Sequence, residues 1–134
     1  MNVVMDASAM IAFLRGESGA EAVLNHMKNP ECSVFAHALN LCEVYYDFAR
    51  ASGEAVAADA INDLLALGIR ERNEMHGAFW RAMGRLKSTY KRVSLADCAA
   101  LVLTNDLAAI LLTADHHELQ RLHATGVCKL EFIR

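Results

Sequence analysis

Residues 3–14 have the sequence VVMDASAMIAFL, in which a short apolar run ends at Asp6 and an apolar helical pattern follows. The run is typical of a buried strand, and Ser8 to Leu14 are expected to form a short helix that Gly16 ends. A strand followed by a helix is the repeating unit of a parallel sheet covered by helices. Asp6 then lies at the carboxyl end of its strand, where such sheets bind ligands.

The rest of the chain repeats this alternation of strands and helices. Further strands are predicted at 33–35, 69–72, 109–113 and 129–133, the last of them at an edge of the sheet. Helices are predicted from Ser18 to Met27 and over 37–50, 54–67, 74–90, 94–107 and 116–123. A capping box formed by Ser18 and Glu21 is expected to start the first of these. In the helix at 74–90, one face carries Met75, Ala78, Phe79, Ala82, Met83, Leu86 and Tyr90.

Length and composition indicate one compact domain over residues 1–134, because 54% of the residues are hydrophobic and only one is proline. The four cysteines form no C-x-x-C pair and lie among apolar neighbours, so they are expected to be buried and reduced. Asp6 interrupts any signal-peptide core, and the longest apolar stretch, 98–114, contains Asn105 and Asp106. The sequence therefore predicts a cytoplasmic protein without a membrane segment.

The charge distribution is uneven although the net charge is only −3. Residues 70–92 hold seven of the thirteen bases and two acids, a formal charge of +5 against −8 elsewhere. This segment could bind a polyanion, or it could be an ordinary solvated helix face.

Four acids stand in or beside apolar runs, where an ionised carboxylate is costly unless it is paired or holds a metal. They are Asp6, Glu43, Asp97 and Asp115. Asp6 and Asp115 follow predicted strands, and Asp97 lies in the first turn of a helix. Glu43 shares a helix face with Leu39 and Tyr46, which is expected to point inward. The four carboxylates are therefore expected to converge, and a hard divalent cation is the simplest partner.

Each acid except Glu43 also has an ordinary structural explanation. Asp6 and Asp115 could cap the helices that follow them, and Asp97 could form a capping box with Ser94. Ser8 and Thr113, which stand close to Asp6 and Asp115 in the sequence, could hydrogen-bond a carboxylate or a phosphate, or merely cap helices. A transition-metal site at His116-His117 is disfavoured, since adjacent histidines on a helix do not face each other.

The chain resembles the PIN-domain nucleases, and within them the VapC-type toxins of type II toxin–antitoxin pairs. The resemblance covers essentially the whole chain and rests on an ordered set of segments. These are VVMDAS (3–8) with MIAFL (10–14), NLCEV (40–44), SLADCAA (94–100) and ILLTAD (110–115). One departure is Ala7, at a position where Thr or Ser is frequent.

This resemblance implies a three-layer α/β/α sandwich around a mostly parallel sheet of four or five strands. It implies an endoribonuclease that depends on Mg²⁺ or Mn²⁺, with the metal held by the four acids. It also implies an antitoxin protein that covers the site, and a homodimer. Given an RNA substrate, the basic residues Arg81, Arg85 and Lys87 could bind phosphates beside the scissile one. The alternatives are a PIN-like module that binds RNA or protein without cutting, and a different phosphotransfer enzyme such as a phosphatase.

Overall fold

A single parallel sheet of five strands runs through the centre of the molecule, in a computed structural model that describes residues 1–134. The strands are β1 (Asn2–Met5), β2 (Ser33–His37), β3 (Arg70–Arg72), β4 (Ile110–Thr113) and β5 (Leu130–Phe132). Their order is β3-β2-β1-β4-β5, and all pairings are parallel. All five predicted strands are confirmed, and β5 lies at an edge as expected.

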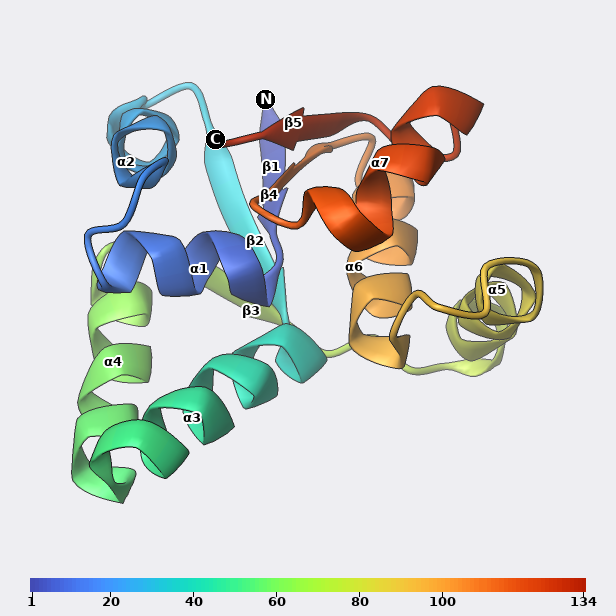
Figure 1. Ribbon diagram of the computed structural model, residues 1–134. Helices are drawn as coiled ribbons and strands as arrows, with labels where there is room; N and C mark the ends of the chain where they lie inside the picture. Colours follow the sequence, from blue (N-terminus) through green and yellow to red (C-terminus); the bar gives the residue numbers. More distant parts are fainter.

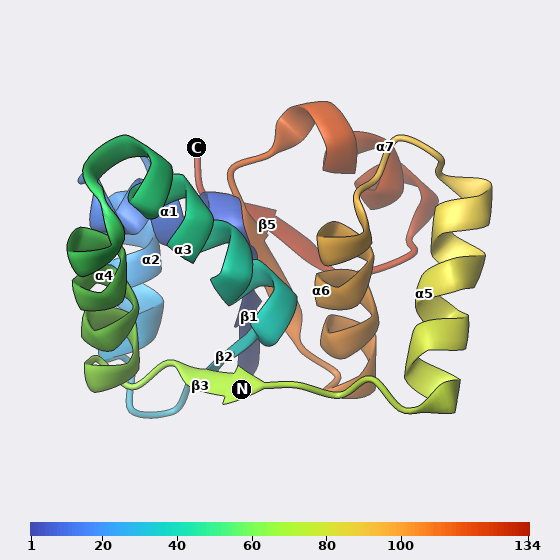
Figure 2. The same ribbon diagram turned by 90° about the horizontal axis from the view of Figure 1, so that it is seen from below.

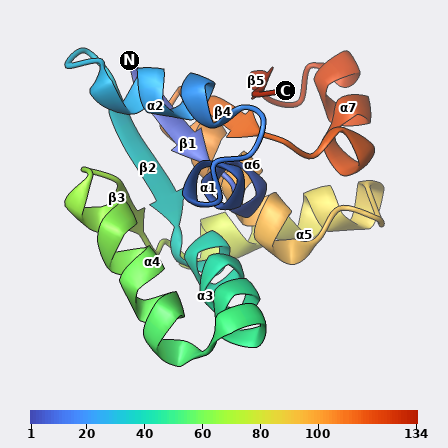
Figure 3. The same cartoon turned by 60° about the vertical axis from the view of Figure 1, so that its left-hand side comes forward.

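Seven helices connect the strands and cover both faces of the sheet (Figure 1). They are α1 (Ala7–Leu14), α2 (Ala20–Lys28), α3 (Ala38–Ser52), α4 (Glu54–Ala66), α5 (Gly77–Thr89), α6 (Leu95–Asp106) and α7 (His116–Thr125). Figure 3 shows α1 to α4 gathered on one side. Figure 2 shows α5 beside α6 on the other side, with α7 next to them. The predicted three-layer α/β/α sandwich is confirmed.

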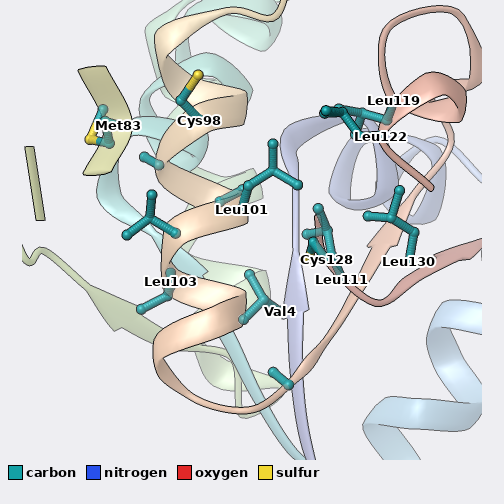
Figure 4. Packing of buried hydrophobic residues seen from close by; sticks show 14 of the residues in the cluster. Val4, Met83, Cys98, Leu101, Leu103, Leu111, Leu119, Leu122, Cys128 and Leu130 are labelled. Atoms are coloured by element: carbon teal, nitrogen blue, oxygen red, sulfur yellow. The ribbon is translucent and has the colours of Figure 1, made fainter. Parts of the chain in front are cut away.

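The core lies in two layers because successive residues of a strand point to opposite faces of the sheet. Val3 and Met5 of β1 pack with α1, α3 and α4, whereas Val4 packs with α5, α6 and α7. Figure 4 shows the second layer, where Val4 and Leu111 of the sheet meet leucines of α6 and α7. Residues 98–104 of α6 are all buried, which explains the long apolar run in the sequence.

The predicted capping box of Ser18 and Glu21 is wrong. Helix α2 begins at Ala20, and Gly19 before it has a φ of 97° and makes no side-chain capping bond. A Cβ at Gly19 would lie 2.8 Å from the backbone oxygen of Ile133. The close passage of the C-terminal segment, and not a side-chain cap, therefore determines how this helix begins.

Two further expectations are corrected by the burial of side chains. Helix α5 begins at Gly77, and His76 caps it by accepting a hydrogen bond from the Phe79 amide. Met75 therefore precedes the helix, and Met75 and Ala78 are both exposed and do not belong to its buried face. The cysteines are all free thiols, but only Cys98 and Cys128 are buried, and Cys42 is exposed on α3.

No helix combines the length and the apolar character that a bilayer crossing requires.

Candidate functional site

The four acids lie on four elements that meet at one edge of the sheet. The pairing of β1 with β4 places Met5 opposite Leu112, and the Asp6 amide donates to the Leu112 carbonyl (3.2 Å). Asp6 and Asp115 therefore follow neighbouring strands at their carboxyl ends. Asp97 lies in the first turn of α6, and Glu43 lies on α3, which contacts both α1 and α6. Figure 1 shows the first turns of α1, α3 and α6 around the end of β1.

Asp6 is the most buried of the acids, with only 1% of its surface exposed. Its Oδ1 accepts hydrogen bonds from the Ser8 hydroxyl (2.7 Å) and the Ala9 amide (2.9 Å), so Asp6 does cap α1. Its Oδ2 is buried and has no hydrogen-bond partner. Because buried polar atoms are rarely left unpaired, capping explains only half of this carboxylate, and Oδ2 is free to bind a water, a proton or a cation.

Two hydroxyls hold the ends of β1 and β4 in register at the site. The Ser8 hydroxyl lies 3.3 Å from that of Thr113 and accepts a hydrogen bond from the Ala114 amide (2.9 Å). The Thr113 hydroxyl accepts from the Asp115 amide (3.0 Å). Of the roles that the sequence left open for Ser8, bonding a carboxylate is observed, and together with Thr113 it fixes Asp6 relative to Asp115.

The capping explanations for Asp97 and Asp115 hold only in part. The Ser94 hydroxyl accepts from the Asp97 amide (3.0 Å), so Ser94 caps α6 and the carboxylate of Asp97 is not needed as the cap. Asp115 Oδ1 accepts from the Glu118 amide (3.1 Å) and caps α7. Capping therefore uses one carboxylate oxygen of Asp115, Oδ1, as it does at Asp6.

Burial and mutual repulsion raise the pKa values of three of these acids. Burial raises the pKa of Asp97 to about 7, and the charges of Asp6, Glu43 and Asp115 add to the rise. Burial also raises the pKa of Glu43, with further contributions from Asp6 and Asp115. Burial raises the pKa of Asp6 as well, opposed by the nearby Thr113 and Ser8 hydroxyls and the Ala9 amide. The four carboxylates are thus close enough to repel one another, and positive charge would relieve them.

The donor set fits a hydrated Mg²⁺ or Mn²⁺ better than a metal caged by protein alone. No three Asp, Glu, His or Cys side chains are grouped closely enough to ligate one ion. Mg²⁺ keeps several waters and needs only one or two carboxylates from the protein, so a closed cage is not required. The unpaired Oδ2 of Asp6 is a suitable oxygen ligand, whereas a structural zinc site would need several Cys or His ligands.

The expected inward face of α3 needs one correction. Glu43 is half-buried at the edge of the site, but Tyr46, predicted to share its face, is 50% exposed. The buried face of α3 is formed instead by Asn40, Leu41 and Val44. Glu43 therefore lies at the margin of this face, where it can reach both the other acids and solvent.

Two buried polar residues beside the site were not singled out from the sequence. Asn40 is fully buried, its Oδ1 accepts from the Ala7 amide (3.3 Å) and its Nδ2 donates to the Ala96 carbonyl (3.1 Å). His37 caps α3 by accepting from the Leu39 amide at Nδ1, so its Nε2–H donates to the Glu74 carbonyl (2.9 Å). Their only sequence signal is a polar residue within an otherwise apolar segment.

The predicted RNA-binding bases lie along α5 and do not form one group. Arg81 lies over the ring of Trp80, 4.5 Å from its centroid. Arg85 lines a cavity between α5 and α6 together with Asn105 and Asp106. The Lys87 ammonium donates to the carbonyls of Lys91 (2.7 Å) and Val93 (2.8 Å).

Comparison with known proteins gives one family and several similar folds. Residues 3–124 match the PIN domain family. Among curated proteins, none matches this sequence. VapBC2 from Rickettsia felis, solved with a DNA fragment from its promoter, has a TM-score of 0.75 at 12% identity and covers 98% of each chain. VapC20 from Mycobacterium tuberculosis, a toxin that cleaves the sarcin–ricin loop, has a TM-score of 0.71 at 18% identity, over 92% of this chain and 95% of that one. VapBC-1 from nontypeable Haemophilus influenzae has a TM-score of 0.72 at 16% identity, and the match covers 99% of this chain and 98% of that one.

Proposed function

Since the chain belongs to the PIN domain family, we propose that it is a metal-dependent endoribonuclease with Asp6, Glu43, Asp97 and Asp115 as its active site. The observation that carries this proposal is the unpaired, buried Oδ2 of Asp6. It lies among three further carboxylates, of which Glu43 and Asp97, like Asp6 itself, have raised pKa values. Such a site favours binding of a cation, and the oxygen atoms of a substrate could coordinate the same cation.

The proposed roles follow from where each carboxylate lies. Asp6 and Asp97 would be the chief ligands of Mg²⁺ or Mn²⁺, and Asp115 would be a further ligand that acts through a bound water. An ion held there would lower the pKa of a bound water and offset negative charge on the phosphoryl oxygens. Glu43, at the margin of the site and with a pKa raised by burial, holds the attacking water or accepts its proton. Ser8 and Thr113 keep Asp6 and Asp115 aligned.

We also propose that the protein is the toxin of a type II, VapBC-like pair, acting in the cytoplasm as a homodimer that an antitoxin silences. Three of the similar structures named above are VapBC or VapC proteins. An apolar groove of about 400 Å³ gives an antitoxin helix a place to bind. It lies between the end of α1 and the end of α4, and is lined by Phe13, Leu14, Asp63, Ala66 and Leu67. Co-purification with the product of the neighbouring gene tests this part.

The contact of Arg81, Arg85 and Lys87 with RNA remains a prediction from charge. Lys87 is held by two backbone carbonyls, so it shapes the segment before α6 in addition to adding charge there. Charge reversal at Arg81 and Arg85 is expected to weaken RNA cleavage and its dependence on salt.

A cleavage assay separates the nuclease from a module that binds without cutting. The wild type should cleave single-stranded RNA with Mg²⁺ or Mn²⁺ and stop when EDTA is added. Asp6→Asn and Asp97→Asn should lose more than about 100-fold in rate, in line with the loss of a preorganised electrostatic contact. Asp59→Asn, a change at an exposed carboxylate on α4, is the matched control and should retain activity. Metal-independent binding of RNA without cleavage by the wild type would support the alternative.

A further inference from the structure

A cavity beside the acidic site is lined by three permanent cations and a single acid. It has a volume of about 260 Å³ and lies between the segment that joins α5 to α6 and the first turns of α7. Figures 1 and 2 both show α7 beside this segment. The cavity is lined by Thr89, Tyr90, Lys91, Arg92, Val93, His117, Glu118, Arg121 and Leu122.

The three permanent cations of this cavity have no ion-pair partner. Lys91, Arg92 and Arg121 are exposed, and none takes part in any of the six salt bridges of the structure. One acid, Glu118, also lines the cavity, which leaves a formal charge of +2 when His117 is neutral. The net charge of the whole chain is −3, so this cavity is locally positive on an acidic molecule and can attract an anion.

The cavity adjoins the site through two direct connections. Glu118 forms part of its wall, and the Glu118 amide donates to Asp115 Oδ1. Val93, in the opposite wall, directly precedes Ser94, the cap of the helix that carries Asp97. The wall is fixed in shape because the Lys87 ammonium binds the carbonyls of Lys91 and Val93.

The size and chemistry of the cavity favour a phosphoryl group. It is smaller than the roughly 300–1,000 Å³ of typical small-molecule sites, and only three of its nine lining residues are hydrophobic. Arginine guanidinium groups bind phosphate oxygens through paired N–H donors, and lysine acts as a point charge. The Thr89 and Tyr90 side chains each add a hydroxyl that can donate.

We propose that this cavity binds a backbone phosphate of single-stranded RNA next to the one at the acids, with Arg92 and Arg121 as the principal contacts and Lys91 beside them. The proposal rests on the proposed nuclease function, because it assumes that the scissile phosphate lies at Asp6 and Asp97. It assigns the substrate contact to α7 and to the end of the α5–α6 connection, on the opposite side of that connection from Arg81 and Arg85.

The test is binding of a fluorescein-labelled oligoribonucleotide in EDTA, measured over a range of salt concentrations. Each phosphate contact removed should lower the slope of log K against log salt by about 0.7, so Arg92→Gln/Arg121→Gln should lower it by about 1.4. Lys28→Gln/Lys129→Gln removes the same charge from exposed residues that lie outside the cavity and form no ion pair, and it should leave the slope unchanged. Glu118→Gln should tighten binding, because it removes the one negative charge of the lining.

The result that overturns the proposal is a wild-type slope and affinity in Arg92→Gln/Arg121→Gln. It is also overturned if only Arg81→Gln/Arg85→Gln lowers the slope, or if the Arg92/Arg121 variant loses antitoxin binding and not RNA binding. Because the measurement is made without metal, it does not depend on cleavage. A wild type that never cuts RNA would refute the nuclease, whereas an unchanged slope would refute this cavity alone.

Discussion

The side-chain amide of Asn40 donates a 3.1 Å hydrogen bond to the backbone carbonyl of Ala96, across the contact between α3 and α6. Its oxygen accepts from the Ala7 amide in α1. Ala7 follows Asp6, Ala96 precedes Asp97, and Glu43 lies one helical turn after Asn40. One buried amide thus fixes the relative positions of the helices around three of the four acids.

Asn40→Ala should therefore reduce stability and disturb the site together. It leaves the buried Ala7 amide and the half-buried Ala96 carbonyl without their partner, which costs up to about 1–3 kcal/mol for each group. Denaturant unfolding measures the loss, and Mg²⁺-dependent cleavage should fall as well. The matched control is Asn105→Ala, which removes one bond to the Val127 carbonyl from an exposed side chain and should cost well under half as much. Equal losses in the two variants would contradict the positioning role of Asn40.

Gly19→Ala should be far more destabilising than Gly16→Ala. Both glycines have positive φ angles, 97° and 64°, which cost an L-residue roughly 1–2 kcal/mol. Only at Gly19 does the new Cβ also meet the backbone oxygen of Ile133, at 2.8 Å, while Gly16 has open space around it. Since both variants carry the cost of a positive φ, the difference between their free energies of unfolding measures the cost of the collision at position 19. Ile133→Ala should not rescue Gly19→Ala, because part of the collision is with backbone.

In metal-free protein, Asp97 should make stability fall as the pH rises. Its folded pKa of about 7 lies above the ordinary value of 3.8, so the folded state holds more protons between these pH values. The stabilising effect of that proton is complete at low pH and is lost as the pH rises towards 7. In EDTA, the melting temperature of Asp97→Asn relative to wild type should therefore increase from pH 4 to pH 7 and then level off. Asp59→Asn should show no such trend, and a flat difference for Asp97→Asn would contradict the prediction.

Added Mg²⁺ or Mn²⁺ should stabilise the wild type at neutral pH. A ligand at 100 times its Kd adds about 2.7 kcal/mol to the free energy of unfolding. The melting temperature should rise with the ion concentration in the wild type and in Asp59→Asn, and much less in Asp6→Asn. A rise of the same size in Asp6→Asn would show that the ion binds elsewhere.

The cysteines should differ sharply in their reaction with iodoacetamide. Cys42 is exposed, whereas Cys98 and Cys128 are buried, and burial raises the pKa of each of these two thiols to about 11. Because the thiolate is the reactive form, mass spectrometry of the native protein should find Cys42 alkylated first. Modification of Cys98 at the rate of Cys42 would contradict the packing of α6.

The features that the sequence predicts well are those set by local patterns. The alternation of apolar runs with helical periodicity predicts all five strands. Because Asp6 and Asp115 each follow one of these strands, parallel pairing places both acids at the same edge of the sheet. The cap at Ser94 can be predicted because its partner, the Asp97 amide, is only three residues away.

The features that it misses depend on partners that are distant in the chain. A side chain at position 19 would collide with Ile133, so a glycine is needed there. Asn40 is buried because its side chain bonds to the backbone of Ala7 and Ala96. The basic cavity joins residues of the α5–α6 connection to Arg121. Charge alone selected Arg81, Arg85 and Lys87 on α5, because the sequence does not show that α7 lies against the end of that segment.

The contact between Ser8 and Thr113, 105 residues apart, has a consequence for how the protein is made. Pairings between such distant segments form late in folding, since a long loop must close first. During synthesis β1 emerges early but cannot pair with β4 until residues 110–113 have also emerged, so Asp6 and Asp115 remain separated until then. The proposed nuclease site is therefore incomplete in a nascent chain until β4 has paired with β1.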